Sequence, residues 1–295
     1  MRANKPAAET SWVAWLPMAV LPLSAIAVRA SVPPWGFMWL LAFSIFAALK
    51  WLTWWQGRGV SQEHWRSAAY LLAWPGMDAE SFLDARRRVP RPPVMRWVWA
   101  LFEIVLGASL LWGIARRIPV AAELLRGWAG MLGIVLLLHF GSFQLLCLFW
   151  QSSGVDAKPI MLAPIRSASL SEFWGKRWNM GFRQLAHDLV FRPLHRTLGV
   201  HATGFFVFVV SGLIHDLVIS LPAGAGYGLP TMYFMVQGAG VMVERSKVGQ
   251  RLGLRQGARG WLFMAIFTAG PAFWLFHPPF IRRVILPFMQ AIHAL

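Results

Sequence analysis

Long apolar stretches, separated by basic segments, recur along most of this sequence. A membrane-crossing helix takes about 20 predominantly apolar residues, and eight stretches approach that length: Trp12–Val28, Trp35–Trp55, Val94–Ile114, Gly127–Trp150, His201–Leu221, Leu229–Val243, Gly260–Phe276 and Pro279–Leu295. The sixth and eighth are short, and the eighth contains Arg282, Arg283 and His293. The pattern predicts an all-α, polytopic membrane helical bundle with about eight transmembrane helices.

Composition argues against a soluble protein of this size. Only 14% of the residues are charged and the mean hydropathy is +0.51, whereas soluble domains carry about 25% charged residues. The net charge is +16. Because apolar runs separate the basic residues, we expect them to face anionic lipid headgroups rather than nucleic acid. The single cysteine, Cys147, lies in an apolar run and cannot by itself form an internal disulfide or a zinc cluster.

The basic residues are distributed unevenly between the two sides of the predicted bundle. If the N-terminus is cytoplasmic, 22 of the 28 Lys and Arg residues, beginning with Arg2 and Lys5, fall in or beside cytoplasmic segments. Membrane proteins carry such an excess on the cytoplasmic side. We therefore predict a multi-pass protein with a cytoplasmic N-terminus. The compact length favours a bacterial inner membrane, and the endoplasmic reticulum is the alternative. The first apolar stretch lacks a small-residue cleavage site and is expected to be retained as a span.

The segment between the fourth and fifth stretches contains a signal for the start of a helix. Ser169 and Glu172 have the spacing of a capping box, which predicts a helix from Leu170. Apolar residues fall on one stripe of that helix: Trp174, Trp178, Phe182, Leu185 and Leu189. Basic residues fall on the opposite face: Lys176, Arg183 and His187. The pattern predicts one amphipathic helix at the membrane interface, with Asn179 at the border between its faces.

His215 and Asp216 lie inside the fifth apolar stretch. A charged group at membrane depth costs at least ~2.5 kcal/mol, so such residues usually face an interior cavity and function there. A neutral imidazole can accept a proton, and Ser211 lies one helical turn earlier on the same face. A histidine that only links two helices by hydrogen bonds is an equally open interpretation. His139, in the fourth stretch, is a candidate for a second polar group of the same cavity.

A metal site is not expected from the histidines and carboxylates. His187-Asp188 and His215-Asp216 repeat a His-Asp pair. However, the sequence has no His-x-x-x-His spacing and no set of carboxylates that would complete a ligand group.

Two segments together resemble the wax synthase branch of the membrane-bound O-acyltransferase superfamily. They are Ser169-Leu-Ser-Glu-Phe-Trp-Gly-Lys-Arg-Trp-Asn179 and Ser211-Gly-Leu-Ile-His215-Asp216. Trp74–Met77 and Phe276–Phe280 also look like that branch. The resemblance covers most of the chain, as a single domain over residues 1–295, and is strongest in the motif core, residues 167–237. Lys176 stands where the family usually has arginine, and Asp216 where it usually has glutamate.

The resemblance implies transfer of an acyl group from acyl-CoA, as co-substrate, to the hydroxyl of a lipophilic alcohol, with no cofactor and no metal. It makes His215 the general base and Asn179 the residue that orients the reactants or binds the developing oxyanion. Asp216 and Ser211 would support them. The residues implied in substrate binding are Trp174, Lys176, Arg177, Trp178 and Arg183.

Two other functions remain open at this stage. A proton-coupled transporter of a small lipophilic solute could use His215 and Asp216 as a proton relay, and a membrane protein without catalysis could use them for packing. The acceptor alcohol, the acyl chain length and the oligomeric state do not follow from the sequence.

Overall fold

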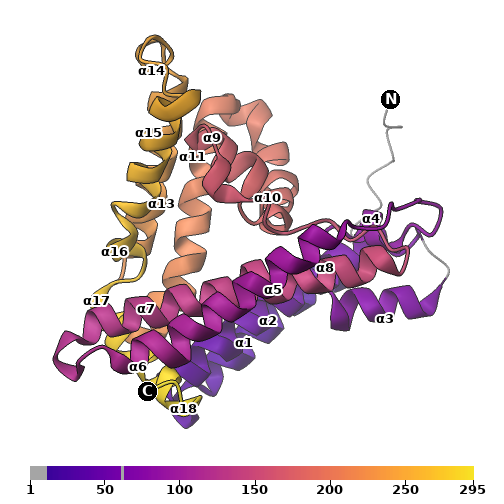
Figure 1. Ribbon diagram of the computed structural model, residues 1–295. Coiled ribbons are helices and arrows are strands. Elements are labelled where there is room, and N and C mark those ends of the chain that lie inside the picture. The colour runs from indigo at the N-terminus through magenta and orange to yellow at the C-terminus, as the bar shows by residue number, and fades with distance from the viewer. Residues whose placement is uncertain (1–11, 61–62) are drawn as a thin grey trace. The chain divides into compact units, whose positions relative to one another are not determined.

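The computed structural model describes residues 12–60 and 63–295, and the regular elements in this part of the chain are all helical (Figure 1). This confirms the all-α prediction. Arg2 and Lys5 lie outside the described residues. The chain divides into two compact units, and it passes between them three times: within α5, within α8 and between Lys158 and Pro159. The first unit holds the described residues up to Val98 together with Leu145–Lys158, and the second holds Trp99–Gln144 together with Pro159–Leu295.

The first unit is built on a long central helix, against which α1, α3 and α4 pack. Its elements are α1 (Trp12–Ala27), η1 (Arg29–Ser31), α2 (Pro34–Gly57), α3 (His64–Ala73), α4 (Ala79–Leu83) and most of α8 (Phe143–Ser152). Tyr70, Trp74 and Phe82 form the centre of a buried core. Lys50, in the middle of α2, is buried beside this core, with its Nζ atom 3.2 Å above the centre of the Tyr70 ring.

The second unit contains every residue that the sequence singled out for catalysis. Its first elements are most of α5 (Val94–Ala108), η2 (Ser109–Ile114), α6 (Ala115–Arg117), η3 (Val120–Ala122), α7 (Glu123–Val135), η4 (Leu136–Ser142), η5 (Pro164–Arg166), α9 (Leu170–Glu172) and η6 (Phe173–Arg177). They are followed by α10 (Met180–Ala186), η7 (His187–Phe191), α11 (Arg192–His215), η8 (Asp216–Ser220), α12 (Leu221–Ala223) and α13 (Leu229–Arg245). The last are α14 (Lys247–Arg251), α15 (Gly257–Ala269), α16 (Ala272–Leu275), α17 (Pro278–Phe280), η9 (Ile281–Ile285) and α18 (Leu286–Ala291).

Four helices of the described chain are long and apolar enough to cross a membrane: Pro34–Gly57, Val94–Arg117, Val120–Ser152 and Met180–Ala223. They contain the second to fifth predicted spans. The seventh and eighth predicted spans lie in one pair of helices, bent by 59°, which makes a fifth crossing if the pair counts as one span. The first and sixth correspond to the shorter helices α1 and α13. The structure therefore supports a membrane protein with four or five such helices, and the predicted number of eight is not confirmed.

The two helices that carry the site, α11 and α13, pack along each other. Gly212 of α11 makes this approach possible, because a Cβ atom there would lie 2.6 Å from the Cα atom of Thr231 in α13. α11 begins well before the predicted span, and Gly199 interrupts it with a non-helical φ of 77°. The regular helix that carries His215 therefore begins close to the predicted start at His201.

Candidate active site

His215 is the last residue of α11, where the helix widens into the π-helical turn η8. Its Nδ1 atom lies 2.7 Å from the carbonyl oxygen of Ser211. A carbonyl oxygen only accepts hydrogen bonds, so Nδ1 carries the hydrogen and, in the neutral ring, Nε2 is the acceptor. The ring packs against Phe234 of α13, with the centroids 4.4 Å apart. The Ser211 carbonyl therefore holds the imidazole in the tautomer that can accept a proton at Nε2, and π-helical turns are common at functional sites.

Asp216 does not bond to the His215 ring but caps the start of α13. Its Oδ1 atom accepts hydrogen bonds from Ser220 Oγ, at 2.8 Å, and from the backbone N–H of Gly228, at 2.9 Å. Its Oδ2 atom accepts from the backbone N–H of Thr231, at 3.1 Å, and from the Thr231 hydroxyl. A carboxylate at this position satisfies N–H groups that the helix itself cannot. Asp216 thus ties the end of α11 to the start of α13.

The hydrogen bonds of Asp216 extend to a second buried histidine, His277, which has no exposed surface. His277 Nδ1 accepts the backbone N–H of Phe280, so Nε2 carries the hydrogen and donates to Ser220 Oγ at 3.2 Å. Gly226, at φ 78°, leaves room for this ring, since a Cβ atom there would lie 2.5 Å from it. The sequence marked His277 only as part of a family-like segment and gave no indication of its link to Asp216.

Asn179 lies in a break between two helices and not within one helix. The helix that starts at Leu170 is confirmed, with Ser169 Oγ accepting the N–H of Glu172 at 3.0 Å. It ends at Arg177, and α10 begins at Met180. Asn179 has φ 45° and ψ 61°, a left-handed conformation that asparagine tolerates better than most residues. The predicted single amphipathic helix through Leu189 is therefore wrong, because its apolar stripe continues across a backbone break.

The side chain of Asn179 caps the helix that follows it. Its Oδ1 atom accepts the backbone N–H of Phe182 at 3.4 Å. Within the described chain, its Nδ2 group has no hydrogen-bond partner. The Oδ1 atom of the amide therefore caps α10, and its two Nδ2–H donors can bind another group.

The segment that leads to Asn179 follows α13 towards the level of His215. Glu244, near the end of α13, accepts the backbone N–H of Leu170 at 2.6 Å. Two turns back along α13, Gln237 accepts the indole N–H of Trp174 at 3.3 Å. The Trp174 ring then lies 5.6 Å from Phe234, the residue that touches His215. The segment that precedes Asn179 therefore runs along α13, and its Trp174 contacts the same phenylalanine as His215.

A series of aromatic contacts links the residue next to Asn179 with His215. Trp178, next to Asn179, stacks on Phe173 at 5.3 Å and has its ring 6.4 Å from that of Trp174. Trp174 also contacts Phe208 of α11 at 6.0 Å. Ring contacts thus run from Trp178, next to Asn179, through Trp174 and Phe234 to His215.

The basic residues of the motif differ in how they are engaged. Arg177 pairs with Glu172, at 2.7 Å, and donates to the carbonyl oxygen of Leu162, at 3.1 Å. Lys176 and Arg183 are exposed. The sequence grouped these three as substrate contacts. Lys176 and Arg183 are the two exposed ones, whereas Arg177 is engaged by Glu172.

His139, the second candidate polar group, lies in the π-helical turn η4. Its Nδ1 atom is buried and has no partner in the part of the chain described. The next residue, Phe140, packs 6.2 Å from Trp178. The His139 ring itself packs against Phe143, with the centroids 5.3 Å apart. Among the described residues, no group of three or more His, Cys, Asp or Glu could hold a metal ion.

We expect Asp216→Ala to destabilise the protein by about 2–4 kcal/mol, since it removes a helix cap and leaves several donors without a charged acceptor. Thermal unfolding in detergent measures the effect. Asp216→Asn keeps one acceptor oxygen and should be intermediate. Equal melting temperatures for Asp216→Ala and the unmodified chain would contradict the capping role.

Glu172 predicts an acid-dependent contribution to stability. The backbone N–H of Ala168 and the Arg177 guanidinium lower the pKa of Glu172 below its ordinary value of 4.5. Its charged contacts therefore stabilise the fold fully above pH 4.5, and this contribution is lost as the pH falls through the lower, folded-state pKa. Glu172→Gln should lower stability by about 1 kcal/mol at neutral pH. The difference from the unmodified chain should shrink in acid, and a difference independent of pH would contradict the assignment.

Comparisons with known proteins match this region of the chain. Residues 157–236, which include Asn179 and His215, match the Membrane bound O-acyl transferase family. The chain is 29% identical over 151 residues to probable long-chain-alcohol O-fatty-acyltransferase 7 of Arabidopsis thaliana, covering 44% of this chain and 42% of that protein. It is 25% identical over 223 residues to probable long-chain-alcohol O-fatty-acyltransferase 2 of the same plant, covering 66% and 60%. It is 28% identical over 142 residues to long-chain-alcohol O-fatty-acyltransferase of Simmondsia chinensis, covering 44% and 40%.

The chain thus spans about half the length of the curated relatives it matches. These similarities confirm the resemblance to the wax synthase-like branch that the motifs indicated.

Proposed function

We propose that this chain, which is similar to the wax synthase-like membrane-bound O-acyltransferases, transfers an acyl group from acyl-CoA to the hydroxyl of a lipophilic alcohol. The observation that carries the proposal is that the family match encloses both Asn179 and His215. The two residues belong to one compact unit, where Trp174, Trp178 and Phe234 connect them. Relatives named as long-chain-alcohol O-fatty-acyltransferases support this chemistry and a long-chain alcohol as the acceptor.

In the proposed reaction, His215 is the general base. Its Nε2 atom takes the hydroxyl proton as the alcohol oxygen bonds to the thioester carbonyl carbon. The tetrahedral intermediate then breaks its carbon–sulfur bond, and the departing CoA sulfur receives the proton from Nε2. The products are an ester and free CoA. The hydrogen bond from Nδ1 to the Ser211 carbonyl supports this role, because it leaves Nε2 as the acceptor.

Asn179 supplies the complementary donor. Negative charge develops on the thioester oxygen during the attack, and a positioned N–H group stabilises that charge more than it stabilises the substrate. The Nδ2 group of Asn179 suits this role because the fold uses only the Oδ1 atom of the side chain. Asp216 acts at a distance, by fixing α13 and therefore Phe234 against the imidazole.

The co-substrate is acyl-CoA, and the proposed reaction needs no resident cofactor or metal. Exposed Lys176 and Arg183 would attract the CoA phosphates, and Arg177 would hold the segment that carries them in place. Trp174 and Trp178 would line the path of the acyl chain or the alcohol. Each of these binding roles can be tested by a separate substitution.

We propose an integral membrane location with the basic segments on the cytoplasmic side, where acyl-CoA is available. Eight crossings would need α1, α13 and both arms of the bent pair to span the bilayer in addition to the four long apolar helices.

The matched relatives named above are plant proteins, and they do not support the prediction of a bacterial inner membrane. We also propose that residues 1–295 act as a single catalytic domain.

The alternative hypothesis, a proton-coupled transporter with His215 and Asp216 as its relay, is not favoured. The relatives that match are O-acyltransferases. Asp216 also accepts several hydrogen bonds that stabilise the start of α13, so protonating it would weaken a structural cap.

The proposal is tested by incubating membranes that contain the protein with mixed acyl-CoAs and alcohols, and identifying new esters by mass spectrometry. We expect esters that are absent from membranes without the protein, and an equal amount of released CoA. If no combination of donor and alcohol gives an ester while the protein is folded and present, the proposed activity is wrong.

A further inference from the structure

Four arginines form one corner of the second unit, the arginine corner: Arg116, Arg117, Arg126 and Arg282. Arg116 and Arg117 end one candidate membrane span, and the next span begins after a short turn. α6 and η9 both pack against α7, which carries Arg126, and Figure 1 shows α6 and α18 near this end of α7. The four arginines are among the six Lys and Arg residues, of 28, that the predicted orientation leaves outside the cytoplasmic segments. Basic residues are sparse on that side of membrane proteins, so four in one place indicate an anionic partner.

Two of these arginines hold the corner together through backbone carbonyls. Arg116 donates to the carbonyl oxygen of His293, just after α18. Arg126 Nε donates to the carbonyl oxygen of Ala115 at 3.2 Å, so α6 and α7 meet beside Arg116. A guanidinium has five N–H donors in a planar fork, and each of these contacts uses one of them. Both arginines are thus held in place and still have N–H groups for another acceptor.

The corner carries more positive charge than its own carboxylates balance. Glu123 is the one acidic side chain in residues 109–135 and 278–295, which form the corner, and it pairs with Arg282 at 2.5 Å. Arg117 is exposed and has no hydrogen bond or ion pair from its side chain within the described residues. In the same part of the chain, neither Arg116 nor Arg126 pairs with a carboxylate. Three positive charges therefore remain for an anion from outside the chain.

Exposed apolar side chains lie next to these charges. They are Ile114, Val120 and Leu125, which surround the arginines in the sequence. Trp112 is also partly exposed, and its indole N–H donates to the carbonyl oxygen of Ile292 at 3.2 Å. Tryptophan is enriched at membrane–water interfaces, where one end of the ring meets apolar groups and the other polar ones. Positive charge beside an apolar border fits a molecule with both an anionic headgroup and acyl chains.

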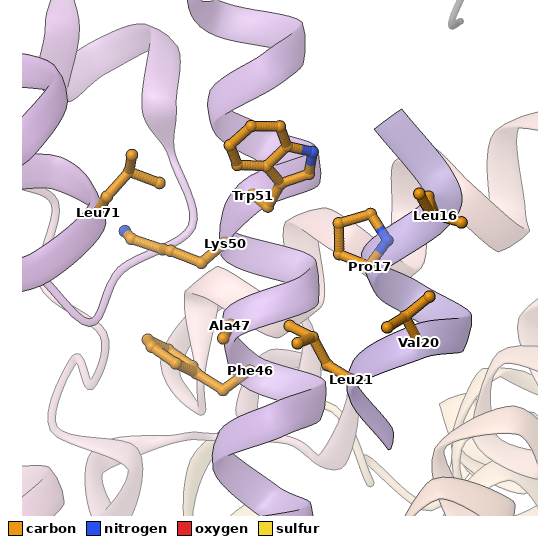
Figure 2. Close-up of a pocket in the computed structure, with 9 residues that line it drawn as sticks. All are labelled: Leu16, Pro17, Val20, Leu21, Phe46, Ala47, Lys50, Trp51 and Leu71. Carbon is orange, nitrogen blue, oxygen red and sulfur yellow. The ribbon is translucent and has the colours of Figure 1, made fainter. Parts of the chain in front are cut away.

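The apolar groove between α1 and α2 in the first unit does not have this combination (Figure 2). Lys50 is the charged residue of its lining. The Lys50 amine donates to the carbonyl oxygen of Gly76 and lies over the Tyr70 ring. The groove therefore presents no unengaged cation to a headgroup, and the arginine corner does.

We propose that the arginine corner binds the headgroup of one anionic phospholipid, and that the exposed apolar residues beside it contact the acyl chains. Arginine can bind a phosphate through two parallel N–H···O bonds. A phosphatidylcholine has the same phosphate, but it also carries a cation that the unpaired arginines repel. The site needs neither acyl-CoA nor an alcohol. With the orientation proposed above, it lies in the leaflet opposite the cytoplasm.

A photoreactive phosphatidylglycerol, with a diazirine near the top of one acyl chain, tests the proposal on the full chain in phosphatidylcholine vesicles. Crosslinked peptides that cover residues 112–126 are quantified by mass spectrometry. Labelling by an equally photoreactive phosphatidylcholine gives the comparison. We expect phosphatidylglycerol to label these peptides about fivefold more strongly, or better, since one basic residue near an anionic group contributes about that factor. Unlabelled phosphatidylglycerol should reduce the labelling, and inorganic phosphate at the same concentration should not.

Two variants should change this lipid preference in opposite directions. Arg117→Gln removes a charge that has no partner in the described chain, and should lower the preference about three- to fivefold at an unchanged melting temperature. Glu123→Gln releases Arg282 from its ion pair and should raise the preference. Arg29→Gln is the matched control, because Arg29 is also exposed at the end of a predicted span, has no side-chain partner among the described residues and lies outside the corner. It should leave the preference unchanged.

Equal labelling by the two lipids would overturn the proposal. Displacement by inorganic phosphate, equal effects of Arg117→Gln and Arg29→Gln, or a weaker preference in Glu123→Gln would do the same. Because labelling is read without acyl-CoA, its outcome is separate from that of the ester-forming assay, and a chain that forms no ester can still show the lipid preference.

Discussion

Replacing His215 with alanine should lower the rate of ester formation by about 10²- to 10⁴-fold, the usual contribution of a positioned general base. Without Nε2, the alcohol must lose its proton to water or attack while still protonated. Initial rates in membranes, normalised to the amount of folded protein, give the measurement. The rate should fall for every acyl-CoA tested, because the proton comes from the alcohol.

The structural alternative for His215, a residue that only links helices, needs its own control. His215→Asn keeps an amide that can donate to the Ser211 carbonyl but has no nitrogen that accepts a proton. If His215 is the base, this variant should melt like the unmodified protein and remain as slow as His215→Ala. Near-normal activity of His215→Asn would show that only the hydrogen bond to the Ser211 carbonyl is needed, and would contradict the assignment of His215 as the general base.

Asn179→Asp should lower the rate by about 10²- to 10³-fold, the effect of removing one oxyanion donor. Aspartate tolerates the left-handed backbone and can still accept the N–H of Phe182. It replaces the Nδ2 donors with an oxygen that repels the developing negative charge. The effect should appear in kcat more than in KM, since the lost contact belongs to the transition state.

Two further substitutions at Asn179 separate its amide from its backbone conformation. Asn179→Gly suits φ 45° and loses the amide, so it should be as slow as Asn179→Asp with a small loss of stability. Asn179→Ala also loses the amide but strains the backbone by about 1–2 kcal/mol. It should therefore form ester as slowly as Asn179→Gly and have a lower melting temperature. Retained activity in Asn179→Gly would contradict a role for the Nδ2 donors.

Local signals in the sequence are sufficient to predict the start of the helix at Leu170 and the positions of the long apolar helices. Ser169 and Glu172 are three residues apart, and their contacts lie within one turn, so the start at Leu170 follows from the sequence. The second to fifth apolar stretches are long enough to be recognised by length alone. The helix break at Asn179 was not predicted, because the apolar stripe on either side keeps the same period.

The contacts that assemble the site come from residues far apart in the sequence. Gln237 and Glu244 are buried in α13, and buried polar residues in a largely apolar helix usually have a partner. That signal was present, but it does not say that the partners are Trp174 and Leu170. The link from Asp216 through Ser220 to His277 was equally hidden, since it depends on the bend between the last two apolar stretches.

Two carboxylates fix the two ends of α13, so the length of this helix sets the spacing of the elements around the site. Asp216 binds its first N–H groups, and Glu244 near its last turn binds the start of α9. The 17 residues of α13 span about 25 Å at ~1.5 Å per residue. One inserted or deleted residue between the anchors would turn one end by about 100° relative to the other. During evolution α13 should therefore accept exchanges of its outward side chains far more readily than any change in its length.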